Sequence, residues 1–273
     1  LTGTKISEKS KKSVLDNTMR LEASAGYQIY EAKMLNNSEL VYTREYQNLS
    51  GKEKQKLLNE AGKQLRPLFG KGKKIPAALK ERFARENYLN NKYKDAIEKG
   101  KTNAAAFAEA NGLNVDFVET QTIEETIQAM KDAGASRKDI NNAKKDLENG
   151  HFDGANVGGK IIVHLPSAIK NRRIGVYSHE VLHSYARMKY GSDNVTHAGK
   201  DLLDYLKRND KDLYARVKFR IDQSYMEKNK EGEIVENEAY WEEAMNAMSD
   251  VLADGHSIKS SSLNQLRSFV KRN

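Results

Sequence analysis

The sequence predicts an α+β fold that is mostly helical and contains a small mixed sheet. Segments with helical periodicity and recognisable caps recur along most of the chain, whereas short runs of β-forming residues occur only after Gly112. With 273 residues, of which 38% are hydrophobic and 31% charged, the chain is long enough to bury a sizeable core in one large domain or two smaller ones. We therefore expect an ordered protein rather than a disordered one.

Helices dominate the first part of the chain. Ser50 and Glu53 form a capping-box pattern, which predicts a helix that continues until Pro67 interrupts it. Pro76 is typical of a first helical turn and predicts a second helix. We expect this second helix to run through Leu79 and Phe83, and a break at Gly100 and Asn103 to precede a separate alanine-rich helix over 104–110.

Strand and helix signals alternate in the middle of the chain. Residues 114–120 have the alternation of a strand, and helices are then predicted to begin at Thr122 and at Ser136. Gly158-Gly159 predicts a turn, which leads into residues 160–165, the most apolar strand candidate of the chain.

The basic residues are unevenly distributed. Residues 1–100 contain 21 Lys and Arg against 12 Asp and Glu, whereas residues 101–273 contain 25 against 26. Such an excess can bind a nucleic acid, an acidic membrane surface or an acidic partner, although a solvated lysine-rich surface has the same composition. We divide the chain into a basic helical N-terminal region over 1–105, a domain over 106–258 and a basic C-terminal tail over 259–273.

Composition excludes several kinds of site. The absence of cysteine removes disulfides, thiolate nucleophiles, iron–sulfur clusters and cysteine zinc sites, so any metal must bind His, Asp or Glu. No apolar stretch approaches the ~18–20 residues of a membrane span, and the N-terminus lacks the pattern of a signal peptide, so we expect a soluble protein. Because the chain begins at Leu1 rather than at Met, we expect it to be part of a larger polypeptide.

The predicted helix after Arg173 contains the sequence His179-Glu180-Val181-Leu182-His183, an HExxH motif. Two imidazoles four residues apart project from the same face of a helix, so both can reach one Zn²⁺ at about 2.0–2.1 Å. Glu180 lies between them and can contact a metal-bound water without being a ligand. The alternative is a pair of surface histidines on an ordinary helix.

A catalytic zinc site needs a third protein ligand and leaves its fourth position to water. The best candidates lie in the predicted helix over 238–253, where Glu242 and Glu243 interrupt an apolar stripe near its edge. A carboxylate in that position is costly unless a partner such as Zn²⁺ compensates its charge. The two residues could instead cap a solvated helix start, and His197 and Asp201 are weaker rivals as ligands.

These residues together resemble the zincin metallopeptidases, specifically the gluzincin-like group, which pairs HExxH with a downstream glutamate on a second helix. Glu243-Ala244, followed by Asn246 and Asp250, is similar to the third-ligand helix of that group and favours Glu243 as the ligand. Lys189 stands where the metzincin arrangement would require a third histidine. The resemblance covers about residues 115–255. In its general sequence pattern the chain is most similar to zincin-like domains of phage and plasmid polyproteins or of toxins.

The resemblance implies zinc-dependent hydrolysis of peptide bonds. Zn²⁺ would be bound by His179, His183 and Glu243, with Glu180 as the general base on the activated water. Two further groups are implied, an oxyanion donor (Tyr225, Tyr240 or His256) and residues that orient the ligands (Asp250 or Asn246). The residues implied to pair with a peptide substrate, as an edge strand, are Ile161, Ile162, Val163 and His164.

Two other interpretations of the function stay open. In one, the zincin fold is a catalytically silent scaffold, and the chain is a structural or nucleic-acid-binding protein of a virion-internal or antirestriction type. In another, the N-terminal region is a pro-segment that covers the cleft. The expected location is the cytoplasm or a virion, with a secreted toxin as the alternative.

Overall fold

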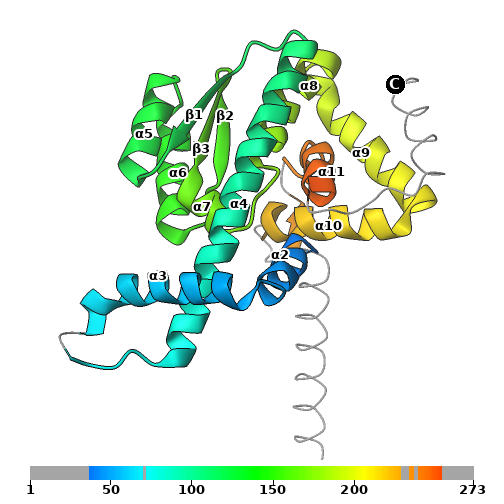
Figure 1. Cartoon of the computed structure of the whole chain (residues 1–273). Helices are drawn as coiled ribbons and strands as arrows, with labels where there is room; N and C mark the ends of the chain where they lie inside the picture. Colours follow the sequence, from blue (N-terminus) through cyan, green and yellow to red (C-terminus); the bar gives the residue numbers. More distant parts are fainter. Residues whose placement is uncertain (1–36, 70–71, 229–233, 237–238, 254–273) are drawn as a thin grey trace, which may run out of the picture.

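The computed structural model describes residues 37–69, 72–228, 234–236 and 239–253 (Figure 1). These residues are mostly helical and carry a small mixed sheet, in agreement with the predicted α+β class. His256 and the tail predicted over 259–273 lie outside them. The elements are α2 (Asn37–Gln47), α3 (Gly51–Phe69), α4 (Ala77–Ala110), β1 (Asp116–Thr120), α5 (Ile123–Asp132), α6 (Arg137–Asn149), β2 (Gly154–Val157), β3 (Lys160–His164), α7 (Leu165–Lys170), α8 (Val176–Tyr190), α9 (Ser192–Asn209), α10 (Lys211–Tyr225), β4 (Met226–Lys228), β5 (Ile234–Glu236) and α11 (Glu243–Ala253).

Local capping signals begin the helices where the sequence predicts. The Ser50 amide donates to Glu53 Oε2 at 2.9 Å, and the Glu53 amide donates back to Ser50 Oγ at 3.3 Å. Thr122 and Glu125 form a second capping box at the start of α5. Each box satisfies backbone donors that the first turn of a helix leaves unpaired, so the prediction needed no tertiary information.

The three-stranded sheet has the order β1-β3-β2, with β3 parallel to β1 and antiparallel to β2. Gly158 and Gly159 join β2 to β3 with φ angles of 58° and 87°. A two-residue hairpin turn with both φ angles positive favours glycine, which has no β-carbon to clash there. The predicted turn is therefore confirmed.

The prediction that Ile161, Ile162, Val163 and His164 form a substrate-binding edge strand is wrong. They belong to β3, the central strand, whose backbone pairs with β1 on one side and β2 on the other. Their continuous apolar run is typical of a strand buried on both faces rather than of an edge. Within the described sheet, β1 and β2 are the edge strands.

Helices cover both faces of the sheet (Figure 1). Ile162 points to one face, where it packs with Met130 and Leu147 of α5 and α6. Ile161 and Val163, on the other face, pack with residues of α4 and α8, among them Ile97 and Tyr177. The alternation along β3 thus places the HExxH helix directly against the sheet.

The expected helix break at Gly100 is absent, because α4 continues through it from Ala77 to Ala110. A β-carbon on Gly100 would lie 2.8 Å from the Ile174 carbonyl oxygen, so the glycine permits a close approach of the loop before α8. The boundary predicted at residue 105 falls inside α4, which places Ala104 and Ala108 in the core around the sheet. No described helix, the 34-residue α4 included, combines the length and apolarity that a membrane span requires.

The helices α9, α10 and α11 form a third layer on the outer side of α8 (Figure 1). Their shared core contains Leu206 of α9, Leu213 and Ile221 of α10, and Ala244 and Val251 of α11. Through this core α11 packs against α8, although more than fifty residues separate the two helices in sequence. The residues near Glu243 therefore lie beside the HExxH motif.

Gly199→Ala tests this docking. A β-carbon on Gly199 in α9 would overlap the carbonyl oxygen of Trp241, just before α11, so we expect an overpacking loss of about 1–3 kcal/mol in the free energy of unfolding. Gly62→Ala in α3 is the matched control, because its β-carbon would meet only Lys80 Cδ at 3.6 Å. For Gly62→Ala we expect the free energy of unfolding to rise by up to about 1 kcal/mol, since alanine has a higher helix propensity than glycine. Urea unfolding measures both, and equal effects at the two positions would contradict the packing described.

Candidate metal centre

Helix α8 positions the two motif histidines and the glutamate between them. Val176, Tyr177 and Val181 anchor α8 in the core against the sheet. His179 and His183, one helical turn apart, lie with ring centroids 5.2 Å from each other, while His179 and Glu180 are only 7% and 8% exposed. The motif is therefore part of the interior and not a pair of surface histidines.

Glu243, the first residue of α11, places its carboxylate between the two imidazoles. Its Oε2 atom lies 3.2 Å from His179 Nε2, and its Oε1 atom lies 3.2 Å from His183 Nε2. In a tetrahedral site with bonds of about 2 Å, two ligand atoms lie about 3.3 Å apart. The ligand atoms of all three residues lie within 4.8 Å of one another, so the group could hold a metal ion.

The structure separates the roles of the neighbouring glutamates. Glu242 Oε1 forms an ion pair with Arg187 at 2.9 Å and lies 3.3 Å from His183 Nδ1, whereas Glu243 lies next to the other ring nitrogen, Nε2. Glu242 therefore supports His183, while Glu243 belongs to the ligand group. The weaker rivals, His197 and Asp201, are exposed on α9 and belong to no such group among the described residues.

Asp250 supports the other histidine from the same helix as Glu243. Its Oδ2 atom lies 3.3 Å from His179 Nδ1, and it is held by Arg173 at 3.0 Å and Arg220 at 3.2 Å. A carboxylate on the second ring nitrogen orients an imidazole toward a metal. Asp250 is therefore placed to orient His179, which is the role that the resemblance implied.

Asn246, one turn after Glu243, packs its amide against His183. The Nδ2 atom lies 3.0 Å from both ring nitrogens, and the side chain is 1% exposed. Asn246 thus limits how the His183 ring can turn.

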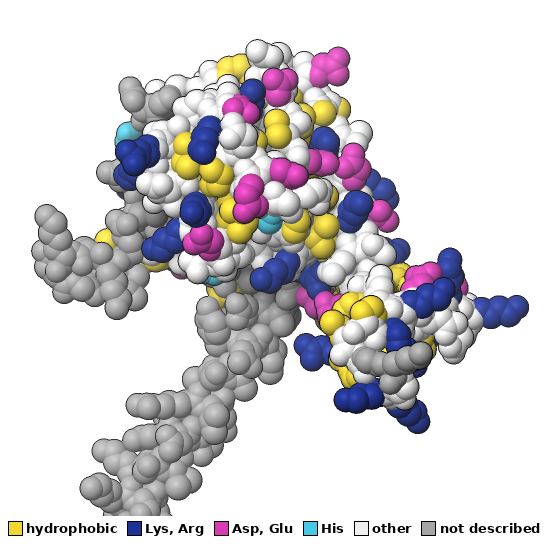
Figure 2. Space-filling view, turned by 90° about the vertical axis from the view of Figure 1, so that its left-hand side faces the viewer, with side chains coloured by type: hydrophobic (Ala, Val, Ile, Leu, Met, Phe, Trp, Pro, Cys, Tyr) yellow, Lys and Arg dark blue, Asp and Glu magenta, His cyan; other side chains and the backbone are white. Residues whose placement is uncertain are grey.

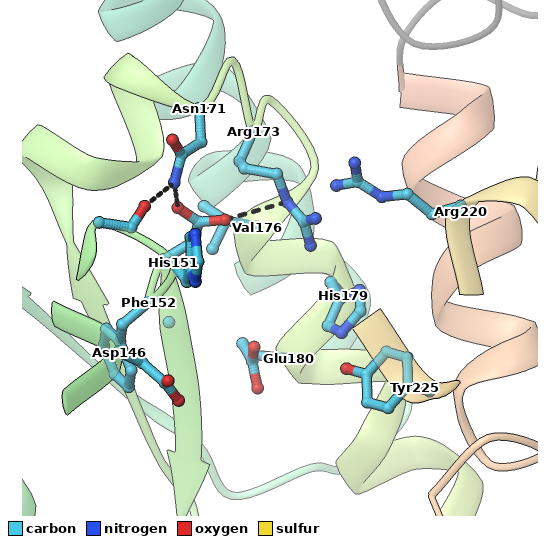
Figure 3. A pocket seen from close by; sticks show the side chains of 13 residues that line it. Asp146, His151, Phe152, Asn171, Arg173, Val176, His179, Glu180, Arg220 and Tyr225 are labelled. Atoms are coloured by element: carbon cyan, nitrogen blue, oxygen red, sulfur yellow. Dashed lines mark hydrogen bonds and ion pairs between the residues drawn. The ribbon is translucent and has the colours of Figure 1, made fainter. Parts of the chain in front are cut away.

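Tyr240 does not reach the centre, contrary to the prediction. Its hydroxyl donates to Asp222 Oδ1 at 2.7 Å and lies 3.1 Å from Lys218 Nζ, so it joins α10 to the turn before α11. Tyr225, at the end of α10, instead lines the cavity beside the motif (Figure 3). The sequence could not distinguish these tyrosines, because the distinction depends on how α10 docks.

A cavity of about 880 Å³ opens beside His179 and Glu180. Figure 3 shows both side chains facing it, with Tyr225 on one wall and Phe152 on the opposite one. Sequence analysis missed four charged residues that also line it, namely Asp146, Asp153, Arg173 and Arg220. No local motif marks them, since they come from α6, the segment before β2, the loop before α8, and α10.

Burial and neighbouring charges shift the pKa values of the centre strongly. Burial raises the pKa of Glu180, although His179 and His183 partly oppose this shift. Burial alone would lower the pKa of His179, but Asp250 and Glu243 outweigh it and raise the pKa to about 10. The pKa of His183 rises to about 9, because Glu242 and Glu243 outweigh its burial. The two imidazoles hold the pKa of Glu243 far below its ordinary value despite its burial.

The charges of the centre fit a divalent cation. Apart from the exposed Asp146, four carboxylates (Asp153, Glu180, Glu243 and Asp250) and two guanidinium groups (Arg173 and Arg220) leave a formal charge of −2 when both imidazoles are neutral. Glu243 Oε2 is buried and accepts no hydrogen bond within the described part of the chain. Protons on the imidazoles or one dication can compensate this charge, and a metal would displace the protons.

Comparison with protein-family models, with curated proteins and with solved structures finds no match for this chain. Its chemistry therefore has to be inferred from its own donor set, two imidazoles and one carboxylate, and from the groups around them.

Paired substitutions test the assignment of the third ligand. Glu243→Gln removes a ligand charge, so we expect zinc binding to weaken by about 100-fold or more. Glu242→Gln leaves the ligand group intact and removes a charge that contacts His183 Nδ1 and Arg187, so we expect zinc binding to weaken by only about tenfold. Competition titration with a zinc-chelating dye measures both affinities. A larger loss in Glu242→Gln would reverse the assignment.

Proposed function

We propose that this chain is a zinc-dependent peptidase of the zincin type. The observation that carries the proposal is the convergence of His179, His183 and Glu243 from two helices, with the buried Glu180 next to them at an open cavity. Two imidazoles and one carboxylate suit Zn²⁺, and three protein ligands are typical of catalytic rather than structural zinc sites. The order of hairpin, HExxH helix and glutamate helix supports the zincin type.

The chain's own groups divide the work of hydrolysis. When bound, Zn²⁺ supplies a Lewis acid that activates water and polarises the substrate carbonyl. Glu180 is suited to accept a proton and pass it to the leaving amine, because burial raises its pKa and so makes the carboxylate a stronger base. Asn156 of β2 donates to the Glu180 backbone carbonyl at 2.9 Å and to Ser184 Oγ at 2.7 Å, which fixes this turn of α8 against the sheet.

Tyr225 is the candidate donor to the oxyanion. Its hydroxyl points toward the space beside His179 and Glu180 (Figure 3). Burial and the nearby Glu243 raise its pKa far above the ordinary value, so the phenol stays protonated and can donate. A donor held in place before reaction stabilises the charge that develops on the carbonyl oxygen.

We further propose that an extended peptide binds along β2 instead of β3. Within the described sheet β2 pairs only with β3, so its other edge is available for main-chain hydrogen bonds. Gly154 of β2 lines the same cavity as His179 and Glu180, so a peptide on this edge would reach the centre.

Glu180→Gln tests the general base. We expect the variant to keep its zinc, since Glu180 is not in the ligand group, and to lose about 10²–10⁴-fold in peptide cleavage. Zinc is measured by mass spectrometry of the purified protein and cleavage by mass spectrometry of a pooled peptide library. Glu148→Gln on the exposed face of α6 is the matched control and should cleave like wild type. Unchanged cleavage by Glu180→Gln would reject the assigned base.

Tyr225→Phe tests the oxyanion donor. Loss of the hydroxyl should lower kcat by about 10²-fold while zinc content and KM stay close to wild type. Tyr214→Phe on the same helix is the control, because Tyr214 packs against the α9–α11 core and does not line the cavity. If the two variants had equal kcat values, Tyr225 would have no such role.

A further inference from the structure

One helical hairpin carries the whole net charge of the chain. Residues 51–85, here called the basic hairpin, comprise α3, the connection after it and the first part of α4. They contain 11 Lys and Arg against 3 Asp and Glu, whereas the other 238 residues contain 35 of each. The hairpin projects from the body below the sheet (Figure 1), and Figure 2 shows Lys and Arg side chains extending from it in several directions.

These cations are not neutralised within the described part of the protein. None of the ten described Lys and Arg side chains of the basic hairpin forms an ion pair with a described acid. Lys54 and Arg66 donate instead to backbone carbonyls, at 2.7 and 2.8 Å. Farther along α4 the pattern changes, since Lys92 pairs with Glu45 at 2.7 Å and Lys101 with Glu119 at 3.2 Å. Mutual repulsion in the hairpin would be relieved by a polyanion.

The outer face of α3 is suited to phosphate groups. Lys56 lies four residues after Lys52, and Lys63 lies eleven residues after it. At about 100° per residue, the three side chains therefore lie within about 40° of one another around the helix. With Gln55, Asn59 and Glu60 they line a shallow hollow of about 490 Å³ that has no apolar side chain in its lining. Ammonium and amide donors in one stripe match the oxygens of a phosphodiester backbone.

Two other polyanions fit less well. A helix that inserts into a bilayer interface buries an apolar face there, and a protein partner is usually held by buried aromatic or aliphatic anchors. The described part of the hairpin exposes only one large apolar side chain substantially, Leu68 at 78%, near its far end. Lys73 and Lys74, also exposed there, extend the basic surface instead.

We propose that the basic hairpin binds the phosphodiester backbone of a nucleic acid, with Lys52, Lys56 and Lys63 as its central contacts. The site is separate from the metal centre, and binding requires neither zinc nor Glu180. Because backbone phosphates are common to all sequences, the binding is electrostatic, without base specificity, and weakens as salt rises.

Fluorescence anisotropy of the full chain tests the proposal, with a labelled mixed-sequence 24-base-pair DNA duplex and a labelled 24-nucleotide RNA as probes. The test variant is Lys52→Gln with Lys56→Gln and Lys63→Gln. The control variant, Lys131→Gln with Lys138→Gln and Lys145→Gln, removes the same charge from exposed positions on α5 and α6. We expect wild type and control to bind at least one probe, and the test variant to bind about tenfold more weakly, with a salt slope smaller by about 2.7 on the duplex or about 2.1 on the single-stranded RNA.

The duplex and the RNA distinguish which nucleic acid is preferred, and preference for either supports the proposal. Lys73→Gln with Lys74→Gln is a second variant that should also weaken binding, and circular dichroism checks that each variant is folded. Absence of binding to both probes at 50 mM salt would overturn the proposal, as would equal weakening in the control. Tighter binding to phosphatidylserine vesicles, or equal competition by polyglutamate, would assign the hairpin to a membrane or an acidic protein instead.

Discussion

The docking of α11 against α8 is the contact on which the centre depends. It places the Glu243 carboxylate 3.2 Å from an imidazole nitrogen of both His179 and His183, in the protein interior. A buried carboxylate is destabilising unless positive charge compensates it, so the helices can meet here only with protonated imidazoles or with a bound cation. The apolar core shared by α9, α10 and α11 holds the helices together, while Asp250, fixed by Arg173, orients His179.

The part of the centre that a single helix determines could be predicted from the sequence. The spacing of His179 and His183 fixes their common face whatever the rest of the chain does. The choice between Glu242 and Glu243 required the structure, because it depends on Arg187, more than fifty residues away in sequence. The prediction of Tyr240 as a candidate oxyanion donor is wrong for the same reason, since the residue that accepts from its hydroxyl, Asp222, lies on α10.

The fold follows the same division between local and long-range information. Capping boxes and the glycine turn between β2 and β3 satisfy local backbone requirements, and their predictions are confirmed. The helix break predicted at Gly100 and the edge strand predicted around Ile162 are wrong, because the roles of these residues depend on neighbours that are distant in sequence. The glycine makes room for the loop at Ile174, and β1, far from β3 in sequence, occupies the second side of β3. Tertiary contacts likewise distinguish the described cations of the basic hairpin, which form no ion pair with a described acid, from Lys92 and Lys101 of the same helix α4, which do.

X-ray absorption spectroscopy of the zinc-loaded protein reports the ligands of the ion without requiring a substrate, and so tests whether His179, His183 and Glu243 bind one metal. We expect about four nitrogen and oxygen neighbours at about 2.0–2.1 Å, with outer-shell scattering from two imidazole rings. Substitution of His179 or His183 should remove one ring from that signal. A shell of oxygen atoms alone, or zinc that stays bound to imidazole when both histidines are replaced, would contradict the assignment of His179, His183 and Glu243 as one metal site.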